Sequence, residues 1–285
     1  MYNKFVGRDI FFSIIIPTLN EESYLPKILS DLASQRVKNF EVIVVDALSQ
    51  DKTREKALEF SKYFTFYFYS VEKKNVSFQR NFGGQKAKSE YIIFLDADSR
   101  VNKMFTGNLY KEILKKRGSL FLPTLITEER SSKNILLFKL VNSVIELSQS
   151  SNKPLAPGGS IIITKKLFTQ LNGFKEDLYI TEDHNLVQRA RKMGIKAKFL
   201  RDIKVVFSLR RVKKEGQVRV MYKYILALIF IMVDLRITSN IFMYEMGGDV
   251  YKDLESKDKW GIKKNTTKFR SIVKKTSSFL VDSLS

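Results

Sequence analysis

Short apolar runs alternate with amphipathic stretches through the first hundred positions of the chain. Uninterrupted runs rich in β-branched and aromatic residues are typical of strands that are buried on both faces of a sheet. Between these runs, apolar residues recur three and four positions apart, which is the spacing of one face of a helix. The pattern predicts strands at 12–17, 40–45, 64–70 and 91–95, and helices at 21–35, 49–60 and 77–87.

Strands that alternate with helices in this way form a mostly parallel sheet, because each helix carries the chain back to the same edge. The alternation is less regular beyond position 98. We therefore expect one α/β domain over residues 1–211, with a Rossmann-like, mostly parallel sheet flanked by helices. Its second half is expected to contain helices at 105–116, 134–147, 165–171 and 181–193, and strands at 119–125, 161–164, 196–200 and 205–208.

The chain changes character at the basic cluster 210–214, and a largely apolar stretch then reaches about Tyr244. Its longest apolar run, 224–233, is about half as long as a membrane-spanning helix and is followed by Asp234 and Arg236. We expect a basic, amphipathic helical extension over 212–285. It would lie on an anionic membrane surface, pack on the domain or form a homodimer.

The composition narrows the classes of site and partner. The chain has no cysteine and a single histidine, His184, which excludes disulfides, thiol nucleophiles and multi-histidine metal centres. The formal charge of +20 favours phosphorylated substrates, an anionic membrane surface or nucleic acid. Residues 1–12 lack the apolar core of a secretory signal, so we expect a cytoplasmic location that includes the cytoplasmic face of a membrane.

Two aspartates, Asp96 and Asp98, follow the buried run 91–95 one residue apart. In extended chain such residues share a face, so their carboxylates repel unless a cation lies between them. Open α/β sheets bind ligands at the carboxyl ends of their strands, and a hard divalent cation that also holds a phosphate would explain the pair. An Asp-rich turn that caps the next helix is the alternative.

Several short motifs, taken in their order and spacing, resemble family 2 glycosyltransferases of the GT-A fold. The resemblance covers roughly residues 12–211 and implies transfer of a sugar from a nucleotide donor with inversion at the anomeric carbon. UDP is the more frequent nucleotide in the family. The motifs are 13–21, 41–53, 80–83, 94–98, 158–159, 172–174, 181–186 and Arg189.

The resemblance implies a metal and nucleotide site. Asp98 would be the principal ligand of Mg²⁺ or Mn²⁺, and Asp96 would contact the ribose or a metal-bound water. Asp46 would accept a hydrogen bond from the nucleobase or ribose, and it also suits a helix cap. Arg80 would reach the diphosphate or base. The remaining nucleotide-binding residues would be Pro17, Leu19, Glu21 and Ala97.

The resemblance also implies a base that deprotonates the acceptor hydroxyl. Asp183 is the preferred residue, and Glu182 could equally serve or bind the sugar. Gly158 and Gly159 would let the backbone approach the donor or acceptor, or would form a simple turn before the strand at 161–164. His184 would lie at the surface or line the pocket. Arg210 and Arg211 would bind donor phosphates or a lipid-phosphate acceptor; a glycan or protein acceptor stays open.

Two other functions compete with sugar transfer. A nucleotidyltransferase also combines an α/β sheet, acids and a metal, but it would carry a Gly-rich basic loop where this chain has residues 17–21. A nucleic-acid-binding protein would interleave aromatic and basic residues on one face, whereas basic residues here cluster after the expected domain. Nucleic acid is therefore disfavoured as a partner.

Overall fold

The computed structural model describes residues 10–129, 131–178, 181–210 and 247–248. The chain divides into two compact units: residues 1–176 with 182–208, and residues 177–181 with 209–285. All of the strands and helices named below belong to the first unit. The extension expected over 212–285 lies outside the described residues except for Gly247 and Gly248, so its role and the boundary at 211 stay predictions. Among the described residues no helix is long and apolar enough to cross a membrane.

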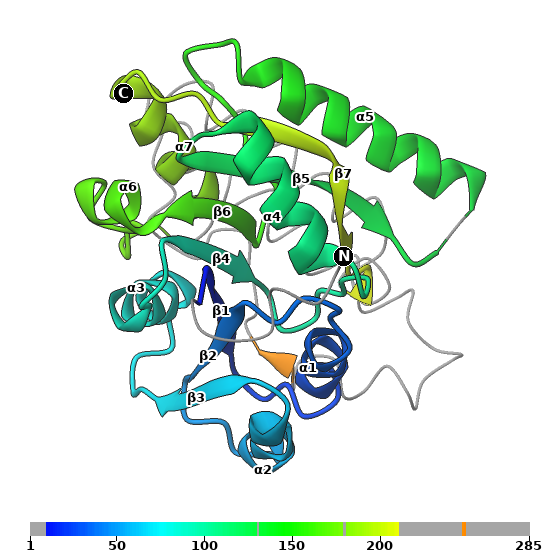
Figure 1. The fold of residues 1–285 in the computed structure, drawn as a ribbon, viewed down its shortest axis with the longest axis vertical. Helices are drawn as coiled ribbons and strands as arrows, with labels where there is room; N and C mark the ends of the chain where they lie inside the picture. Colours follow the sequence, from blue (N-terminus) through cyan, green and yellow to red (C-terminus); the bar gives the residue numbers. More distant parts are fainter. Residues whose placement is uncertain (1–9, 130, 179–180, 211–246, 249–285) are drawn as a thin grey trace, which may run out of the picture. The chain divides into compact units, whose positions relative to one another are not determined.

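A seven-stranded sheet forms the centre of the first unit, in the order β3-β2-β1-β4-β6-β5-β7 (Figure 1). The pairs β2–β3, β1–β2, β1–β4 and β5–β7 are parallel, and β6 is antiparallel to both of its neighbours. The expected mostly parallel α/β sheet is confirmed. The strands are β1 (Phe12–Thr18), β2 (Phe40–Asp46), β3 (Thr65–Ser70), β4 (Tyr91–Leu95), β5 (Leu120–Thr127), β6 (Ser160–Thr164) and β7 (Lys198–Phe207).

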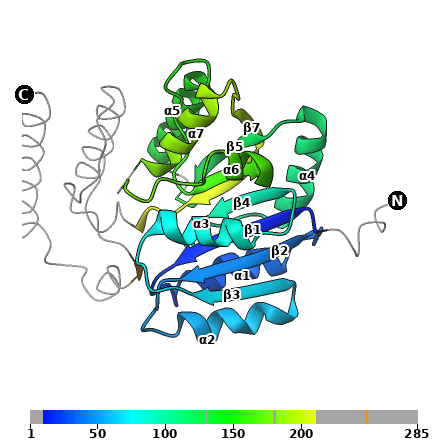
Figure 2. The ribbon, with the colours of Figure 1, turned by 90° about the vertical axis from the view of Figure 1, so that its left-hand side faces the viewer.

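Helices cover both faces of the sheet, and the sheet separates the core into two layers (Figure 2). Side chains of α1 and α4 pack on one face, and those of α6 and α7 on the other. The regularly spaced apolar residues that predicted these helices are the residues that each helix buries against the sheet. The helices are α1 (Leu25–Ala33), α2 (Thr53–Leu58), the 3₁₀ helix η1 (Glu59–Lys62), α3 (Val76–Lys86), α4 (Phe105–Lys116), α5 (Ser132–Ser148), α6 (Lys165–Gln170) and α7 (Glu182–Lys192).

The order of the strands reverses at β1, which pairs with β2 on one side and β4 on the other. Ligands of open α/β sheets bind at such a switch point, beyond the carboxyl ends of the strands. The parallel register places Thr18 beside Asp46 at this edge. Since β6 runs antiparallel, its first residue, Ser160, pairs with the last residue of β4, Leu95. The chain before β6 therefore lies at the same edge.

Several expected boundaries were wrong. Helix α2, expected from residue 49, begins at Thr53. The strands expected at 196–200 and 205–208 are one strand, β7, whose register against β5 shifts between Pro123 and Thr124. The polar residues between the two runs form this irregularity without ending the strand. Helix α1 begins at Leu25 rather than at residue 21, because Pro26 fits the first turn of a helix and residues 21–24 form a separate turn.

Candidate active site

A turn follows β4 and carries the two aspartates at the carboxyl edge of the sheet. The backbone N–H of Ser99 donates to the carbonyl of Asp96 at 3.0 Å, and Ala97 is buried inside the turn. The side chain of Asp96 is 37% exposed and Asp98 is also partly exposed. Both acids therefore leave the buried strand at a place that a ligand can reach.

Arg80 of α3 binds three carboxylates that come from different parts of the chain. Its Nη2 donates to Asp96 Oδ1 at 2.8 Å, and its Nη1 donates to Glu182 Oε1 at 2.9 Å and to Asp183 Oδ1 at 3.2 Å. Burial alone would lower the pKa of Arg80, but Asp183, Asp96 and Glu182 together raise it above its ordinary value. The guanidinium is therefore a fixed positive charge that joins the turn after β4 to the start of α7.

Glu182 and Asp183 form a buried acidic pair in the first turn of α7. Desolvation is the largest cause that raises the pKa of each carboxyl, and with repulsion from Asp183 it brings the pKa of Glu182 to about 7. Arg80 opposes these effects, as does the N–H of Gly159, which donates to Asp183 Oδ2 at 2.9 Å. A carboxyl with a pKa raised toward neutrality is suited to take up a proton from a hydroxyl.

Gly159 lies where the backbone must pass directly over Asp96. Its φ of +73° is in the left-handed region, and a Cβ added there would collide with the Asp96 carboxylate. A Cβ at Gly158 would meet no atom within 4 Å. Of the two glycines in the predicted pocket motif, only Gly159 is required by the geometry of the carboxylate cluster.

Three further motif residues, Asn81, Phe174 and Arg189, fix the position of Arg80 within the carboxylate cluster. Asn81 Oδ1 accepts from the N–H of Phe174 at 2.7 Å, and its Nδ2 donates to the Phe174 carbonyl at 3.0 Å. This clamp places the Phe174 ring against the guanidinium of Arg80, 5.3 Å from ring centre to Cζ. Arg189 donates to the carbonyls of Leu171 and Gly173, which fixes the same turn. These motif residues therefore position Arg80 and do not themselves line the carboxyl edge of the sheet.

Gln79 is a residue that the sequence reasoning missed. Its side-chain amide is buried and donates to the carbonyls of Thr18 at 2.9 Å and Val45 at 2.7 Å, at the ends of β1 and β2. It thereby fixes α3 over the switch point of the sheet, and Arg80 is the next residue. Its position directly before the motif at 80–83 was the available signal, but spacing in the sequence does not reveal which carbonyls Gln79 binds.

The predicted nucleoside residues lie along the β1 and β2 end of the same edge. Asp46 is buried at the end of β2 and accepts from the N–H of Ser49 at 2.9 Å and from its hydroxyl. Desolvation is the main cause that raises its pKa. The N–H of Glu21 donates to Thr53 Oγ1 at 2.8 Å, so the loops after β1 and β2 are joined. Pro17 is buried at the end of β1 and Leu19 is half-buried in the loop that follows.

His184 faces the loop before β6. Its Nδ1 accepts from the N–H of Ala156 at 2.8 Å, so the proton of the neutral ring lies on Nε2. Burial lowers its pKa to about 4. The ring therefore fixes the loop that leads to Gly159. Arg210 belongs to the second compact unit and Arg211 lies outside the described residues, so their predicted role stays a prediction.

A divalent metal fits the acids after β4. Within the described ranges, no group of three or more His, Cys, Asp or Glu side chains could hold a metal ion by itself. Mg²⁺ is usually held by one or two carboxylates together with substrate phosphates, and Asp96 and Asp98 supply such an oxygen set. Three carboxylates face the single guanidinium of Arg80, and the excess negative charge would be offset by a cation.

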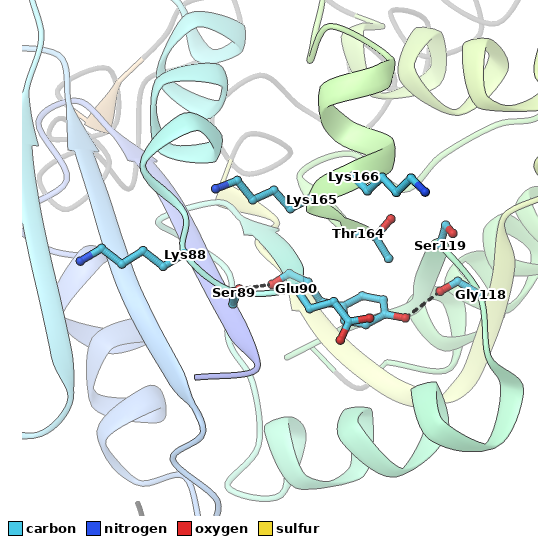
Figure 3. Close-up of a pocket in the computed structure, with 9 residues that line it drawn as sticks. Lys88, Ser89, Glu90, Gly118, Ser119, Thr164, Lys165 and Lys166 are labelled. Atoms are coloured by element: carbon cyan, nitrogen blue, oxygen red, sulfur yellow. Dashed lines mark hydrogen bonds between the residues drawn. The ribbon is translucent and has the colours of Figure 1, made fainter. Parts of the chain in front are cut away.

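A cavity of about 610 Å³ lies at the opposite, amino-terminal edge of β4, between residues 88–91, 118–119 and 164–166 (Figure 3). Two of its three lysines already bind protein groups: Lys165 Nζ donates to the Ala87 carbonyl and Lys88 Nζ to the Tyr67 hydroxyl. Figure 3 shows Lys165 and Lys166 extending in opposite directions. The cavity contains no convergent charge and is separate from the carboxylate cluster.

Solved structures with the same fold include two sugar-nucleotide complexes. "TarS 1-349 in complex with UDP-GlcNAc" from S. aureus has a TM-score of 0.58 and 22% identity, over 69% of this chain and 58% of that one. The mannosyltransferase PcManGT from Pyrobaculum calidifontis, in complex with GDP-Man and Mn²⁺, has a TM-score of 0.64 and 16% identity, over 98% and 80%. These likenesses confirm the expected GT-A fold.

Sequence comparison identifies the family. "Glycosyltransferase GlyA" of Streptococcus pneumoniae is 32% identical over 114 residues, which are 39% of this chain and 16% of the relative. The chain also spans no more than 56% of the glycosyltransferases of Rickettsia typhi and Staphylococcus aureus that it matches. The model of "Glycosyl transferase family 2" matches residues 13–171, more than half of the 285 residues. The chain belongs to glycosyl transferase family 2.

Proposed function

We propose that the protein is a metal-dependent, inverting glycosyltransferase that moves a sugar from a UDP-sugar to a hydroxyl or lipid-phosphate acceptor. One observation carries the proposal: Arg80 joins Asp96, at the sheet's switch point, to the buried pair Glu182 and Asp183. A site for a nucleotide diphosphate and a site for a proton acceptor thus share one guanidinium. An inverting displacement needs these two functions on opposite sides of the anomeric carbon.

Asp98 and Asp96 would hold Mg²⁺ or Mn²⁺ together with the donor diphosphate. The metal would supply Lewis-acid stabilisation of the charge that develops on the leaving diphosphate. Asp96 also keeps its bond to Arg80, so it would be held in one orientation while the donor binds. Asp46, Pro17, Leu19, Glu21 and Ala97 would contact the nucleoside from the loops at the same edge.

Asp183 would be the base. The acceptor oxygen forms a bond to the anomeric carbon, the bond from that carbon to the diphosphate oxygen breaks, and the acceptor proton passes to the Asp183 carboxylate. Each Asp183 oxygen makes one hydrogen bond, to Arg80 or Gly159, and a carboxylate oxygen retains a second lone pair. Glu182, whose pKa is raised to about 7, would bind a sugar hydroxyl or replace Asp183 as the base.

Arg80 would act as a positioning residue, because its Nη1 and Nη2 donate to carboxylates. Gly158 and Gly159 would bring backbone close to the transferred sugar, and Arg210 and Arg211 would bind phosphates.

The names of relatives support a nucleotide-sugar donor: TarS is solved with UDP-GlcNAc and PcManGT with GDP-Man and Mn²⁺. TarS is named as a poly(ribitol-phosphate) transferase, which supports a phosphorylated acceptor for this basic chain. A cytoplasmic, membrane-peripheral location stays a prediction.

Calorimetric titration with UDP-GlcNAc and GDP-mannose, each with and without Mn²⁺, tests the proposal. We expect the UDP-sugar to bind only with Mn²⁺, and Asp98→Asn to weaken that binding about tenfold or more. Asp202→Asn, an exposed acid on β7, is the control and should bind like the wild type. Binding of neither donor at millimolar concentration, or Mn²⁺-dependent release of pyrophosphate from a nucleoside triphosphate, would contradict the proposal.

A further inference from the structure

The chain that follows Asp98 is anchored to helix α1 by a bidentate ion pair. Arg100 donates from Nε to Asp31 Oδ2 at 2.6 Å and from Nη2 to Asp31 Oδ1 at 2.8 Å. The N–H of Val101 donates to the same Asp31 Oδ2 at 3.0 Å. Two parallel hydrogen bonds between a guanidinium and a carboxylate fix the orientation of both groups. One side chain of α1 therefore holds two consecutive residues that begin two positions after Asp98.

The backbone of Arg100 has a second anchor, on strand β7. Its N–H donates to the carbonyl of Val206 at 3.2 Å, and the N–H of Val206 donates to the Arg100 carbonyl at 2.9 Å. Just before it, the N–H of Ser99 donates to the carbonyl of Asp96 at 3.0 Å. The partly exposed Asp98 therefore lies in a segment whose main chain is fixed at residues 96, 99 and 100.

The position of Asp31 within α1 indicates that this acid serves the contact with Arg100 and not the helix. Asp31 lies in the last turn of α1, where the unpaired carbonyls carry a partial negative charge. An acid in that turn is repelled by the helix dipole, and the Asp31 side chain is only 15% exposed to water. Its hydrogen bonds with Arg100 and Val101 offset both of these unfavourable effects.

The ion pair is too exposed to contribute much to the stability of the fold. The Arg100 side chain is 36% exposed, and its second partner, Glu128 at 3.7 Å, is 68% exposed. A metal ligand is far more sensitive to small displacements, because Mg²⁺ requires near-ideal octahedral geometry. Groups that orient a metal ligand without touching the metal typically change metal affinity by about 10–100-fold. Arg80 orients Asp96 in this way through its own hydrogen bond.

We propose that Arg100 and Asp31 are positioning residues, which hold Asp98 in place for a divalent cation. This inference rests on the proposed function, which makes Asp98 the principal metal ligand. The charge of Arg100 by itself would act in the opposite direction, because a guanidinium near the site repels the cation. Removal of Arg100 should therefore weaken cation binding if its role is positional, and strengthen it if only its charge matters.

Calorimetric titration with UDP at stepped Mn²⁺ concentrations tests the proposal. In Arg100→Met, the Mn²⁺ concentration that gives half-maximal UDP binding should rise about tenfold or more. UDP affinity at saturating Mn²⁺ should stay close to that of the wild type, because the nucleotide contacts are unchanged. Arg201→Met is the matched control: Arg201 binds Glu146 at 3.0 and 3.1 Å on the surface, and its loss should not change the Mn²⁺ requirement.

Two more variants separate geometry from charge and connect the two residues. Arg100→Lys keeps the charge but cannot form the bidentate pair, and it should also raise the Mn²⁺ requirement. Asp31→Asn should raise that requirement in the wild type and much less in Arg100→Met, because both residues act through one contact. Each variant should unfold close to the wild-type midpoint in urea, which shows that the domain is folded.

A Mn²⁺ requirement that is unchanged or lowered in both Arg100 variants would overturn the proposal. Weaker UDP binding at every Mn²⁺ concentration would also overturn it, since that result indicates general damage to this edge of the sheet. An equal effect of Asp31→Asn in both backgrounds would show that Asp31 acts independently of Arg100. UDP binding by the wild type without any need for Mn²⁺ is a different result: it contradicts the metal dependence of the proposed function, and the inference falls with it.

Discussion

Replacing Arg80 with methionine should expose how much the carboxylate cluster depends on its guanidinium. Methionine keeps much of the aliphatic volume beside Phe174 but removes the three ion pairs, at 2.8, 2.9 and 3.2 Å. Removal of one partner of a buried ion pair costs about 3–5 kcal/mol, because the remaining charge stays buried. Since small domains unfold at about 5–15 kcal/mol, the variant should fold with a clearly reduced free energy of unfolding.

The cost should depend on pH. The pKa values of Glu182 and Asp183 are already raised by burial, and without Arg80 they should rise further. A carboxyl whose folded pKa exceeds its unfolded value contributes stability at low pH, and this is lost as the pH rises through the folded pKa. The difference between wild type and Arg80→Met should therefore grow from pH 6 to pH 8, by up to about 1.4 kcal/mol per pH unit for each carboxyl.

Urea unfolding at pH 6 and pH 8 measures this difference, with Arg100→Met as the matched control. Arg100 binds Asp31 through two nitrogens at 2.6 and 2.8 Å, but its side chain is 36% exposed. Its loss should cost about 1 kcal/mol or less, with little change between the two pH values. An Arg80→Met protein as stable as Arg100→Met, with no dependence on pH, would refute the buried network.

Three further changes test separate parts of the site. Gly159→Ala should reduce stability by about 1–3 kcal/mol and abolish metal-dependent donor binding, because its Cβ would displace Asp96. Gly158→Ala should leave stability unchanged, because a Cβ there meets no atom within 4 Å. His184→Asn keeps a hydrogen-bond acceptor and removes the imidazole. Because the folded pKa of His184 is lowered to about 4, the neutral ring contributes stability above pH 6.5, and that stability is lost as the pH falls toward 4. In thermal unfolding at stepped pH, the ring should cost the wild type up to about 1.4 kcal/mol per pH unit in this range, and the variant should not show this loss. Gln79→Met should cost about 1–3 kcal/mol in urea unfolding, and an unchanged midpoint would show that α3 is held otherwise.

The sheet could be predicted from the sequence because its strands are buried runs bounded by turns. The same logic placed Asp46, Asp96 and Asp98 at one edge, since each follows such a run. The single strand β7 could not be predicted, because continuity past the polar residues 201–202 depends on the neighbouring strand β5. Propensity within one segment does not contain that information.

The candidate site was only partly predictable for a similar reason. Two of the three carboxylates that Arg80 binds, Glu182 and Asp183, lie about a hundred positions from it in the chain. Gly159 and Asp96, which lie against each other, are more than sixty positions apart. The sequence motifs identify these residues but do not indicate which of them are in contact in the folded protein. Gln79 and Asn81 went unassigned because amides bind backbone carbonyls whose positions only the folded sheet defines.

Sugar transfer by the double variant Glu182→Gln, Asp183→Asn, measured at saturating UDP-sugar and Mn²⁺, tests whether the buried acids of α7 remove the acceptor proton. Both replacements preserve side-chain size and remove the two α7 carboxylates that Arg80 connects to Asp96 in the turn after β4. We expect a rate reduced about a hundredfold or more, which is the usual contribution of a positioned base. Turnover at the wild-type rate would show that these carboxylates take no part in proton transfer.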